Sequence, residues 1–171
     1  MKKEEIYFAG GCFWGVEHFF SLVKGVVFTQ AGYANGHTEN PSYEQVCRNN
    51  TGHAETVRVI YDADIVSLKK LLLLFFEIID PTSLNRQGHD VGTQYRTGIY
   101  YINASDLPTI QNIVNQISIK YKKPIVVEVC KLGVFYSAED YHQKYLIKNP
   151  DGYCHINPAL FELAKNAKCD E

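Results

Sequence analysis

The sequence has almost no net charge and lacks any long apolar segment. Seventeen basic and nineteen acidic side chains leave a formal net charge of −2, whereas nucleic-acid-binding domains are usually strongly basic. The longest apolar run, residues 71–76, has six residues, far fewer than the roughly 18 needed to span a bilayer. The first residues, MKKEEIYFAGG, have no apolar stretch like that of a secretion signal. These absences argue against a nucleic-acid partner and a membrane span, and they predict a cytoplasmic protein.

The chain also lacks any pair of cysteines spaced as a metal or redox motif. An odd number of cysteines cannot close entirely into disulfides, so at least one thiol is free. Because no C-x-x-C pair is present, neither a zinc ribbon nor a thioredoxin-type motif is expected, and we expect no bound metal. In a reducing compartment the thiols are either buried filler or take part in chemistry. The five are Cys12, Cys47, Cys130, Cys154 and Cys169.

Length and periodicity predict a single domain over residues 1–171, with residues 148–171 as a C-terminal tail. Hydrophobic residues make up 46% of the chain and charged residues 21%, which are globular values. Apolar patterns predict strands at 5–9, 26–34, 56–61, 98–102 and 125–129. Helical spacing and caps predict helices after Gly11, at 67–79, at 106–122 and at 137–147. This order indicates helices on a mixed sheet, as an α/β or a split-βαβ α+β sandwich.

The sharpest local feature is GCFWG at residues 11–15, which puts Cys12 on a strand-to-helix turn. Glycines there let a ligand approach the backbone closely. The free N–H groups and the positive dipole at a helix start favour a thiolate, which is the nucleophilic form of cysteine. Phe13 and Trp14 would then wall an apolar slot for a small alkyl or thioether group. The alternative is a buried cysteine in a tight turn with core aromatic residues beside it.

Other segments offer acid and hydrogen-bonding groups. GHAETV at 52–57 places His53 and Glu55 at the start of an apolar strand. A carboxyl in apolar surroundings has a raised pKa and can serve as a general acid, whereas a solvated carboxylate is the alternative. Candidates for oxygen-directed or orienting contacts are Tyr43, Asp90, Gln94 and Tyr95.

The remaining cysteines divide into two groups. Cys47 and Cys130 lie in apolar context and are expected to be inert filler. Cys154 follows a turn signal and Cys169 lies near the end of the chain, so both suit a mobile resolving thiol.

Six segments follow one another along the chain, namely GCFWG, PSYEQVC, GHAETVRVIYD, HDVGTQYR, AEDYHQKYL and NPDGYC. Together they make the chain, from about residue 5 to 155, resemble the peptide methionine sulfoxide reductase A family. This resemblance implies an α+β fold, a two-layer sandwich of helices on a mixed β-sheet with a ferredoxin-like βαββαβ core. It also implies reduction of methionine S-sulfoxide, free or in oxidised proteins and peptides, by a monomer without a bound cofactor.

The resemblance further implies a role for each site residue. Cys12 attacks the sulfoxide sulfur, while Phe13 and Trp14 hold the substrate methyl group. Glu55 is the acid that protonates the sulfoxide oxygen. The residues implied around that oxygen, as hydrogen-bonding or orienting groups, are Tyr43, Tyr95 and Asp90.

The resemblance also implies that a second thiol is needed to regenerate Cys12. Loss of methionine leaves Cys12 as a sulfenic acid, which Cys154 converts to a disulfide for thioredoxin, or dithiothreitol in vitro, to reduce. Cys169 is a candidate for a second recycling thiol. Residues 158–168 are predicted to be helical and would then span about 16 Å, so Cys169 reaches Cys154 only if the segment folds back or melts.

Two other classes of function fit part of the sequence. A cysteine hydrolase or acyltransferase would use Cys12 with His53 or His142 as base, but it leaves Trp14 and Cys154 without a role. His142 is alternatively a partly buried helix residue. An aromatic-lined peptide-binding module is the non-catalytic alternative.

Overall fold

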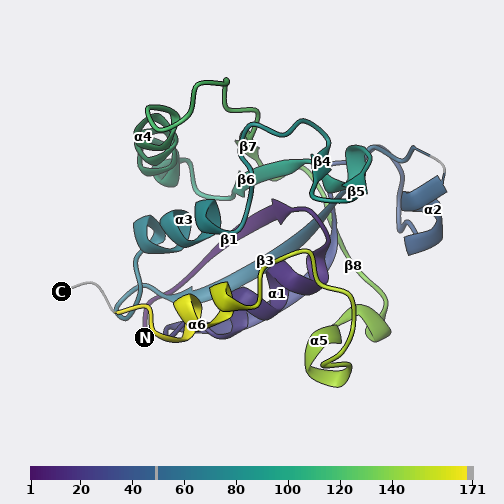
Figure 1. Cartoon of the computed structure of the whole chain (residues 1–171), viewed down its shortest axis with the longest axis horizontal. Coiled ribbons are helices and arrows are strands. Elements are labelled where there is room, and N and C mark those ends of the chain that lie inside the picture. Colours follow the sequence, from purple (N-terminus) through teal and green to yellow (C-terminus); the bar gives the residue numbers. More distant parts are fainter. Residues whose placement is uncertain (49, 169–171) are drawn as a thin grey trace.

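One six-stranded sheet organises the chain. The computed structural model describes residues 1–48 and 50–168, and its strands lie in the order β7-β6-β1-β3-β2-β8 (Figure 1). Neighbouring strands are antiparallel except β6 and β7, which are parallel, so the sheet is mixed. The strands are β1 (Lys3–Gly10), β2 (Val26–Ala34), β3 (Ala54–Asp62), β6 (Thr97–Tyr101), β7 (Glu128–Lys131) and β8 (Phe135–Ser137).

Helices and short elements connect these strands. The helices are α1 (Phe13–Ser21), α2 (Tyr43–Arg48), α3 (Leu68–Glu77), α4 (Leu107–Ser118), α5 (Tyr145–Lys148) and α6 (Ala159–Lys165). The polar loop before β6 holds a small hairpin of β4 (Arg86–Gln87) and β5 (Asp90–Val91), followed by the 3-10 turn η1 (Thr93–Tyr95). Two further 3-10 turns are η2 (Ala104–Asp106) and η3 (Asp140–His142).

The central six elements form a ferredoxin-like core, as the resemblance implies. In chain order they are β1, α1, β2, β3, α3 and β6, and the four strands lie in the antiparallel order β6-β1-β3-β2. The interleaving arises because β1 and β2, joined through α1, leave room for β3 between them. The predicted α+β sandwich is confirmed.

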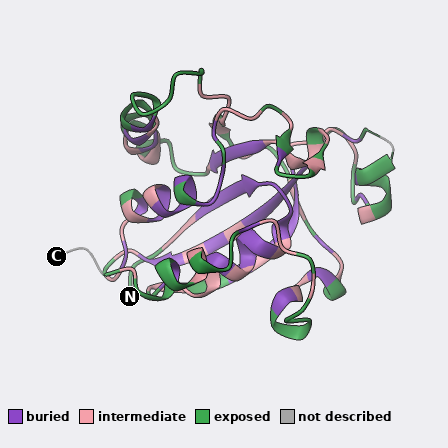
Figure 2. Ribbon diagram, in the orientation of Figure 1, coloured by how far each residue is buried: buried purple, intermediate pink, exposed green. Residues whose placement is uncertain are grey.

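Strand β1 contributes side chains to a large hydrophobic core on one face of the sheet and to a smaller one on the other face. Successive side chains of a strand point to opposite faces, so Ile6 and Phe8 enter the main core while Tyr7 lies on the other side. The Phe8 ring stacks on Phe20 of α1 at 4.6 Å and on Phe75 of α3 at 4.7 Å between centroids. Figure 2 shows the buried strands beneath these helices. Helix α1 has only buried and intermediate residues, whereas α3 has exposed residues at Lys69 and Glu77. Burial of large aromatic side chains therefore fixes α1 against the sheet.

The last strand of the predicted order is displaced from its expected position. The predicted strand at 125–129 is observed at Glu128–Lys131, where it pairs with β6. Val126 instead donates its backbone N–H to the carbonyl of Pro81, in the loop after α3. A contact with a distant loop thus replaces sheet pairing for the first residues of this apolar run.

The helix predicted over 137–147 is wrong as a continuous element. Ser137 ends strand β8, and only η3 and α5 are helical in this region. The Gln143 side chain hydrogen-bonds the backbone N–H and carbonyl of Ala31 on β2, each at 2.8 Å. Lys144 follows with φ of 51°, in the left-handed region. The edge of the sheet therefore captures Gln143 and interrupts the helix.

The C-terminal segment returns to the first helix. Helix α6 confirms most of the helix expected at 158–168, and it packs on α1 through the Phe161 ring, which meets His18 edge-on at 4.7 Å. Ala164 is fully buried. This contact brings the chain around residue 154 back to the start of α1.

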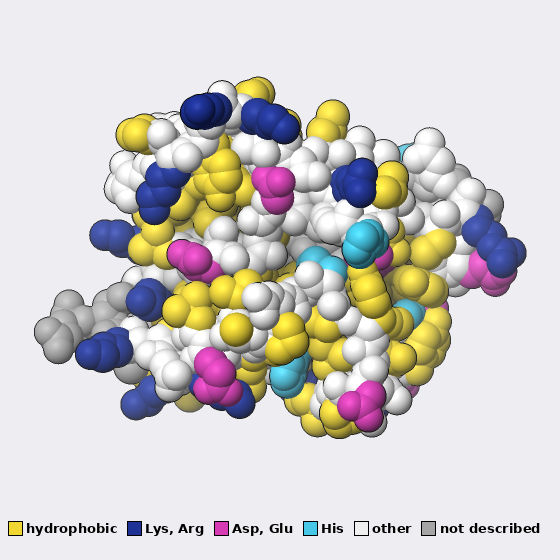
Figure 3. All heavy atoms as spheres, in the orientation of Figure 1, with side chains coloured by type: hydrophobic (Ala, Val, Ile, Leu, Met, Phe, Trp, Pro, Cys, Tyr) yellow, Lys and Arg dark blue, Asp and Glu magenta, His cyan; other side chains and the backbone are white. Residues whose placement is uncertain are grey.

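Charged side chains of both signs lie on the surface of the protein. On the face shown in Figure 3, Lys and Arg side chains are spread over several places among Asp and Glu side chains. Within residues 1–48 and 50–168, no helix is long and apolar enough to cross a membrane.

Candidate active site

The candidate nucleophile lies where the central strand passes into the first helix. Strand β1 ends at Gly10, and Cys12 is the N-cap residue of α1. Gly11 adopts φ of +86°, and a Cβ on it would lie 2.8 Å from the Gln87 Cβ. Only glycine accepts that conformation and that approach without strain. The turn places the Cys12 thiol at a helix N-terminus with only 7% of the residue exposed.

A hydrogen bond ties this turn to a buried carboxyl on β3. The backbone N–H of Phe13 donates to Oε1 of Glu55 at 3.3 Å, and Glu55 is 1% exposed. Its second oxygen, Oε2, is buried and has no partner among the described residues. Burial raises the pKa of Glu55 to about 8, with Phe13 opposing the shift and Asp90 adding to it. At neutral pH this group is a carboxylic acid with a proton to give.

The Cys12 thiol does not ionise as readily as its position at a helix start predicts. Burial, and next the charge of Glu55, raise its pKa well above the ordinary value. The backbone hydrogen bond from Trp14 lowers it, but by less. The expectation of a thiolate favoured by the helix terminus is therefore wrong for the free enzyme, because desolvation outweighs the helix dipole.

Aromatic rings form one side of the site. The Phe13 ring is buried and lies 5.1 Å from the ring of His142. The Trp14 indole N–H donates to Nδ1 of His142 at 2.9 Å, and the indole stacks on Tyr145 at 3.7 Å between centroids and 10° between planes. Both contacts fix the indole plane. They hold Trp14 as a rigid, partly exposed wall beside the thiol.

Tyr43 and Tyr95 both interact electrostatically with the Glu55 carboxyl. Tyr43 begins α2 and packs on His142 with centroids 4.5 Å apart, while Tyr95 ends η1. Burial and then the charge of Glu55 raise the pKa of each phenol. Both phenols therefore keep their protons and stay hydrogen-bond donors.

Asp90 and Cys154 connect the site to the C-terminal segment. Asp90, in β5, accepts a hydrogen bond from the Tyr153 hydroxyl at 3.0 Å. A Cβ placed on Gly15 would lie 3.0 Å from the Cys154 Sγ, so this sulfur packs on the first turn of the helix that Cys12 caps. Burial raises the pKa of the Cys154 thiol. Cys169 lies outside the described residues.

Of the two histidines proposed as alternative bases, His53 is engaged away from the thiol, whereas His142 lies in the site against Phe13 and Trp14. His53 is 1% exposed, and its two ring nitrogens contact the Gly36 N–H and the Thr38 carbonyl. Nδ1 of His142 accepts a hydrogen bond from the Trp14 indole N–H, so the proton of the neutral ring lies on Nε2. The charged groups that shift the pKa of Cys12 are Glu55, Asp90 and Cys154, and none of these three is an imidazole. This arrangement disfavours an acyl-transfer nucleophile.

Sequence reasoning missed some neighbours of the site. Cys47, expected to be inert filler in an apolar context, is exposed on α2, and its thiol hydrogen-bonds Tyr43. Sequence reasoning assigned no role to Tyr145 or Tyr153, although they lie in the segments AEDYHQKY and NPDGYC. Their contacts with Trp14 and Asp90 link residues more than sixty positions apart, which local pattern does not reveal.

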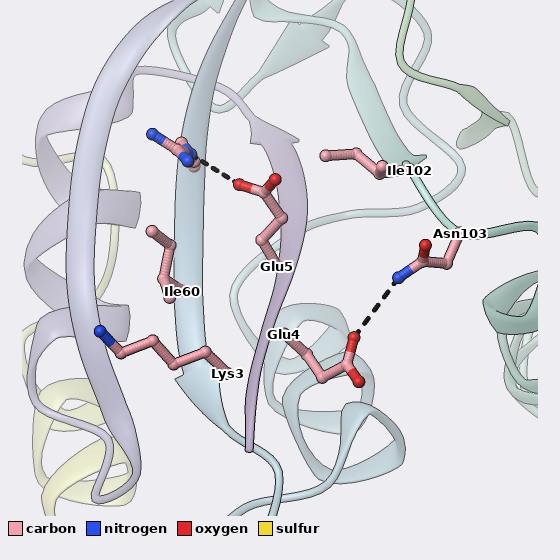
Figure 4. A pocket seen from close by; sticks show the side chains of 7 residues that line it. Lys3, Glu4, Glu5, Ile60, Ile102 and Asn103 are labelled. Atoms are coloured by element: carbon pink, nitrogen blue, oxygen red, sulfur yellow. Dashed lines mark hydrogen bonds and ion pairs between the residues drawn. The ribbon is translucent and has the colours of Figure 1, made fainter. Parts of the chain in front are cut away.

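A separate surface pocket lies at the opposite end of β1. It has a volume of about 350 Å³, and its lining includes Lys3, Glu4 and Asn103. Figure 4 shows Glu4 reaching towards Asn103, with which it shares a hydrogen bond. Lys3 and Gly10 are the two ends of β1, so the strand separates this pocket from the thiol by roughly 20 Å. Neither Cys12 nor Glu55 lines it, and it is not part of the site.

The fold and the site together define a class, namely an enzyme that pairs a buried thiol with a buried carboxylic acid beside rigid aromatic rings. The model of the family described as peptide methionine sulfoxide reductase matches residues 4–170. The chain belongs to that family, and it is an enzyme of thiol-dependent methionine sulfoxide reduction.

Individual relatives agree with this assignment. The peptide methionine sulfoxide reductase MsrA of Lachnoclostridium phytofermentans is 60% identical over 165 residues, which cover 96% of this chain and 99% of the relative. Reduced Mxr1 from Saccharomyces cerevisiae has a TM-score of 0.86 at 38% identity, covering 91% of this chain and 92% of Mxr1. Mxr1 in complex with Trx2 has a TM-score of 0.61 at 26% identity, covering 84% and 85% of the two chains.

Glu55→Gln tests the carboxyl. It removes the acid proton, so release of methionine in a single turnover should slow by about 10²–10⁴-fold. It also removes the carboxylate charge that raises the pKa of Cys12, so the pKa of Cys12 should fall. That pKa is measured from the ultraviolet absorbance of the thiolate as the pH rises, after subtraction of the same titration of a Cys12→Ser variant. In the parent enzyme the acid form exists below about pH 8, so the rate contribution of the proton should disappear as the pH rises through 8.

The matched control is Glu162→Gln, which removes an exposed carboxyl on α6 and should change neither quantity. An unchanged methionine rate in Glu55→Gln would contradict the role of this group as the acid.

Proposed function

We propose that the enzyme reduces methionine S-sulfoxide, free and in oxidised proteins and peptides, through a Cys12 sulfenic acid and a Cys12–Cys154 disulfide. The observation that carries this proposal is the buried Glu55 carboxyl, held by the Phe13 N–H beside the Cys12 thiol. A protonated acid near a thiol is what reduction of a sulfoxide requires, because the oxygen must be protonated as it leaves sulfur.

In the first step the Cys12 sulfur attacks the sulfoxide sulfur while Glu55 gives its proton to the sulfoxide oxygen. Tyr43 and Tyr95 donate hydrogen bonds to that oxygen and stabilise its developing charge. The oxygen then forms a bond to the Cys12 sulfur as its bond to the substrate sulfur and the new sulfur–sulfur bond both break, so methionine leaves and Cys12 becomes a sulfenic acid. The sulfoxide is reduced, the thiol is oxidised, and the thiol proton replaces the one that Glu55 gave.

Stereochemistry follows from three fixed contacts with a pyramidal sulfur. The wall of Phe13 and Trp14 takes the methyl group, Glu55 takes the oxygen, and Cys12 approaches from a third direction. Three fixed directions accept only one hand of the sulfoxide, and methionine sulfoxide reductases divide into one enzyme per epimer. The resemblance to the A class assigns the S epimer.

The second step uses the thiol that packs on Gly15. The Cys154 sulfur attacks the Cys12 sulfur, and the hydroxyl leaves as water with the Cys154 proton, so a disulfide forms. A thioredoxin dithiol then reduces that disulfide and becomes oxidised. The complex of Mxr1 with Trx2 supports this partner. Cys169 stays a candidate for a further relay.

The protein needs no bound cofactor in this scheme, because electrons pass only between sulfur atoms. Among the described residues no group of three or more His, Cys, Asp or Glu side chains is placed to hold a metal ion. The proposal further places the enzyme in the cytoplasm, since thioredoxin keeps thiols reduced there. It also takes the chain to act as one domain and as a monomer, with β1 and α6 in one core.

The reaction is tested with the separated S and R epimers of a blocked methionine sulfoxide and dithiothreitol as reductant. Methionine should form from the S epimer alone. Cys12→Ser should form none, because a serine hydroxyl is a far weaker nucleophile than the cysteine sulfur that it replaces. Product from the R epimer, or activity in Cys12→Ser, would contradict the mechanism.

Cys154→Ser separates reduction from recycling. Without the resolving thiol, the variant should still release one equivalent of methionine per enzyme, because Cys12 and Glu55 are unchanged. Turnover supported by thioredoxin should be lost. The two quantities are measured by rapid quench and by coupled thioredoxin oxidation. Sustained turnover with thioredoxin would overturn the Cys154 assignment.

A further inference from the structure

Residues 154–156 pack against the start of α1 at two glycines, Gly11 and Gly15, which lie before and after Cys12 in the sequence. On one side, a Cβ on Gly15 would lie 3.0 Å from both the Cys154 Sγ and the Ile156 Cδ1. On the other side, a Cβ on Gly11 would lie 3.0 Å from the His155 Nε2. Both glycines therefore leave space that this segment fills, with Cys12 between them in the sequence.

His155 makes the polar contact between this segment and the turn before α1. Its Nε2 lies 3.0 Å from the carbonyl oxygen of Gly10, the last residue of β1. A carbonyl only accepts, so Nε2 carries the proton and donates it. Nδ1 is buried and has no partner among the described residues. Burial lowers the pKa of His155, which keeps the ring neutral and uncharged in this position.

We infer that His155 is a positioning residue for disulfide closure, because it fastens the segment of the resolving thiol to the turn that presents Cys12. This inference rests on the proposed role of Cys154. His155 has no part in the reduction of the sulfoxide, whose acid is Glu55.

The physical reason is the cost of ordering a free segment. If residues 154–156 moved freely, Cys154 would have to find the Cys12 sulfenic acid by chain motion and lose conformational freedom on closing. The hydrogen bond to Gly10 and the burial of Ile156, which is 3% exposed, hold the sulfur near α1 before closure begins. Closure is therefore sensitive to His155, whereas methionine release is not.

The bond changes at closure leave His155 outside the chemistry. The Cys154 sulfur bonds to the Cys12 sulfur, the sulfur–oxygen bond of the sulfenic acid breaks, and water leaves with the Cys154 proton. Since its donor is already bound to Gly10, the contribution of His155 is geometric. A neutral donor of similar reach should therefore replace it.

The experiment compares His155→Leu with His155→Gln. Leucine keeps bulk but removes the donor, whereas the glutamine amide keeps an N–H with similar reach. One equivalent of methionine sulfoxide is mixed with reduced enzyme, and samples are quenched with an alkylating agent. Methionine release reports the first step. Loss of alkylated Cys154 by mass spectrometry reports closure, because the first step consumes only the Cys12 thiol. His37→Leu, which changes an exposed histidine, is the matched control.

We expect methionine release to stay within twofold in every variant. Closure should slow about tenfold in His155→Leu, the equivalent of one hydrogen bond, and should return to within threefold of the parent rate in His155→Gln. Closure at the parent rate in His155→Leu would overturn the inference, and so would equal slowing in both variants, which would indicate a proton-accepting ring nitrogen. If the parent enzyme itself releases no methionine, the proposed function fails instead.

Discussion

The hydrogen bond from the Phe13 backbone to Glu55 is the contact on which the site depends. It joins the turn after β1 to strand β3, so the nucleophile and the acid are positioned by the same central strands. Glu55 also pairs in register with Tyr33 of β2, which leaves its backbone no freedom to move towards water. The ferredoxin-like core therefore fixes the carboxyl where a single backbone N–H meets it.

Burial of a carboxyl with one donor determines its charge. A buried carboxylate needs several hydrogen bonds or a cation to stay ionised, and otherwise it takes up a proton. Glu55 has the Phe13 N–H as donor to one oxygen, and its second oxygen has no partner within residues 1–48 and 50–168. The same desolvation raises the pKa of Cys12. The site is thus a pair of neutral acids at rest, and a bound sulfoxide can take a proton from the carboxyl while the thiol attacks.

The local sequence pattern predicted most strands of the sheet, but it did not predict the contacts that distant side chains make with those strands. Strand β2 has the expected bounds and Ser67 caps α3 through its side chain, because alternation and capping act within a few residues. The 137–147 region was misjudged because Gln143 bonds Ala31, over a hundred positions away. Similarly, the resemblance identified Cys12 and Glu55, but the sequence does not contain the desolvation that reverses the expected Cys12 ionisation. The contact of His155 with Gly10 is equally long-range.

The measurement that tests this account most directly is the titration of Glu55 itself. Carbon NMR of protein labelled at the glutamate carboxyls, with Glu55→Gln to identify the resonance, reports the proton on this one group. The account predicts a midpoint at about 8 in the free enzyme. A midpoint near the ordinary value of 4.5 would show an ionised carboxylate at neutral pH and would contradict the acid role on which the mechanism rests.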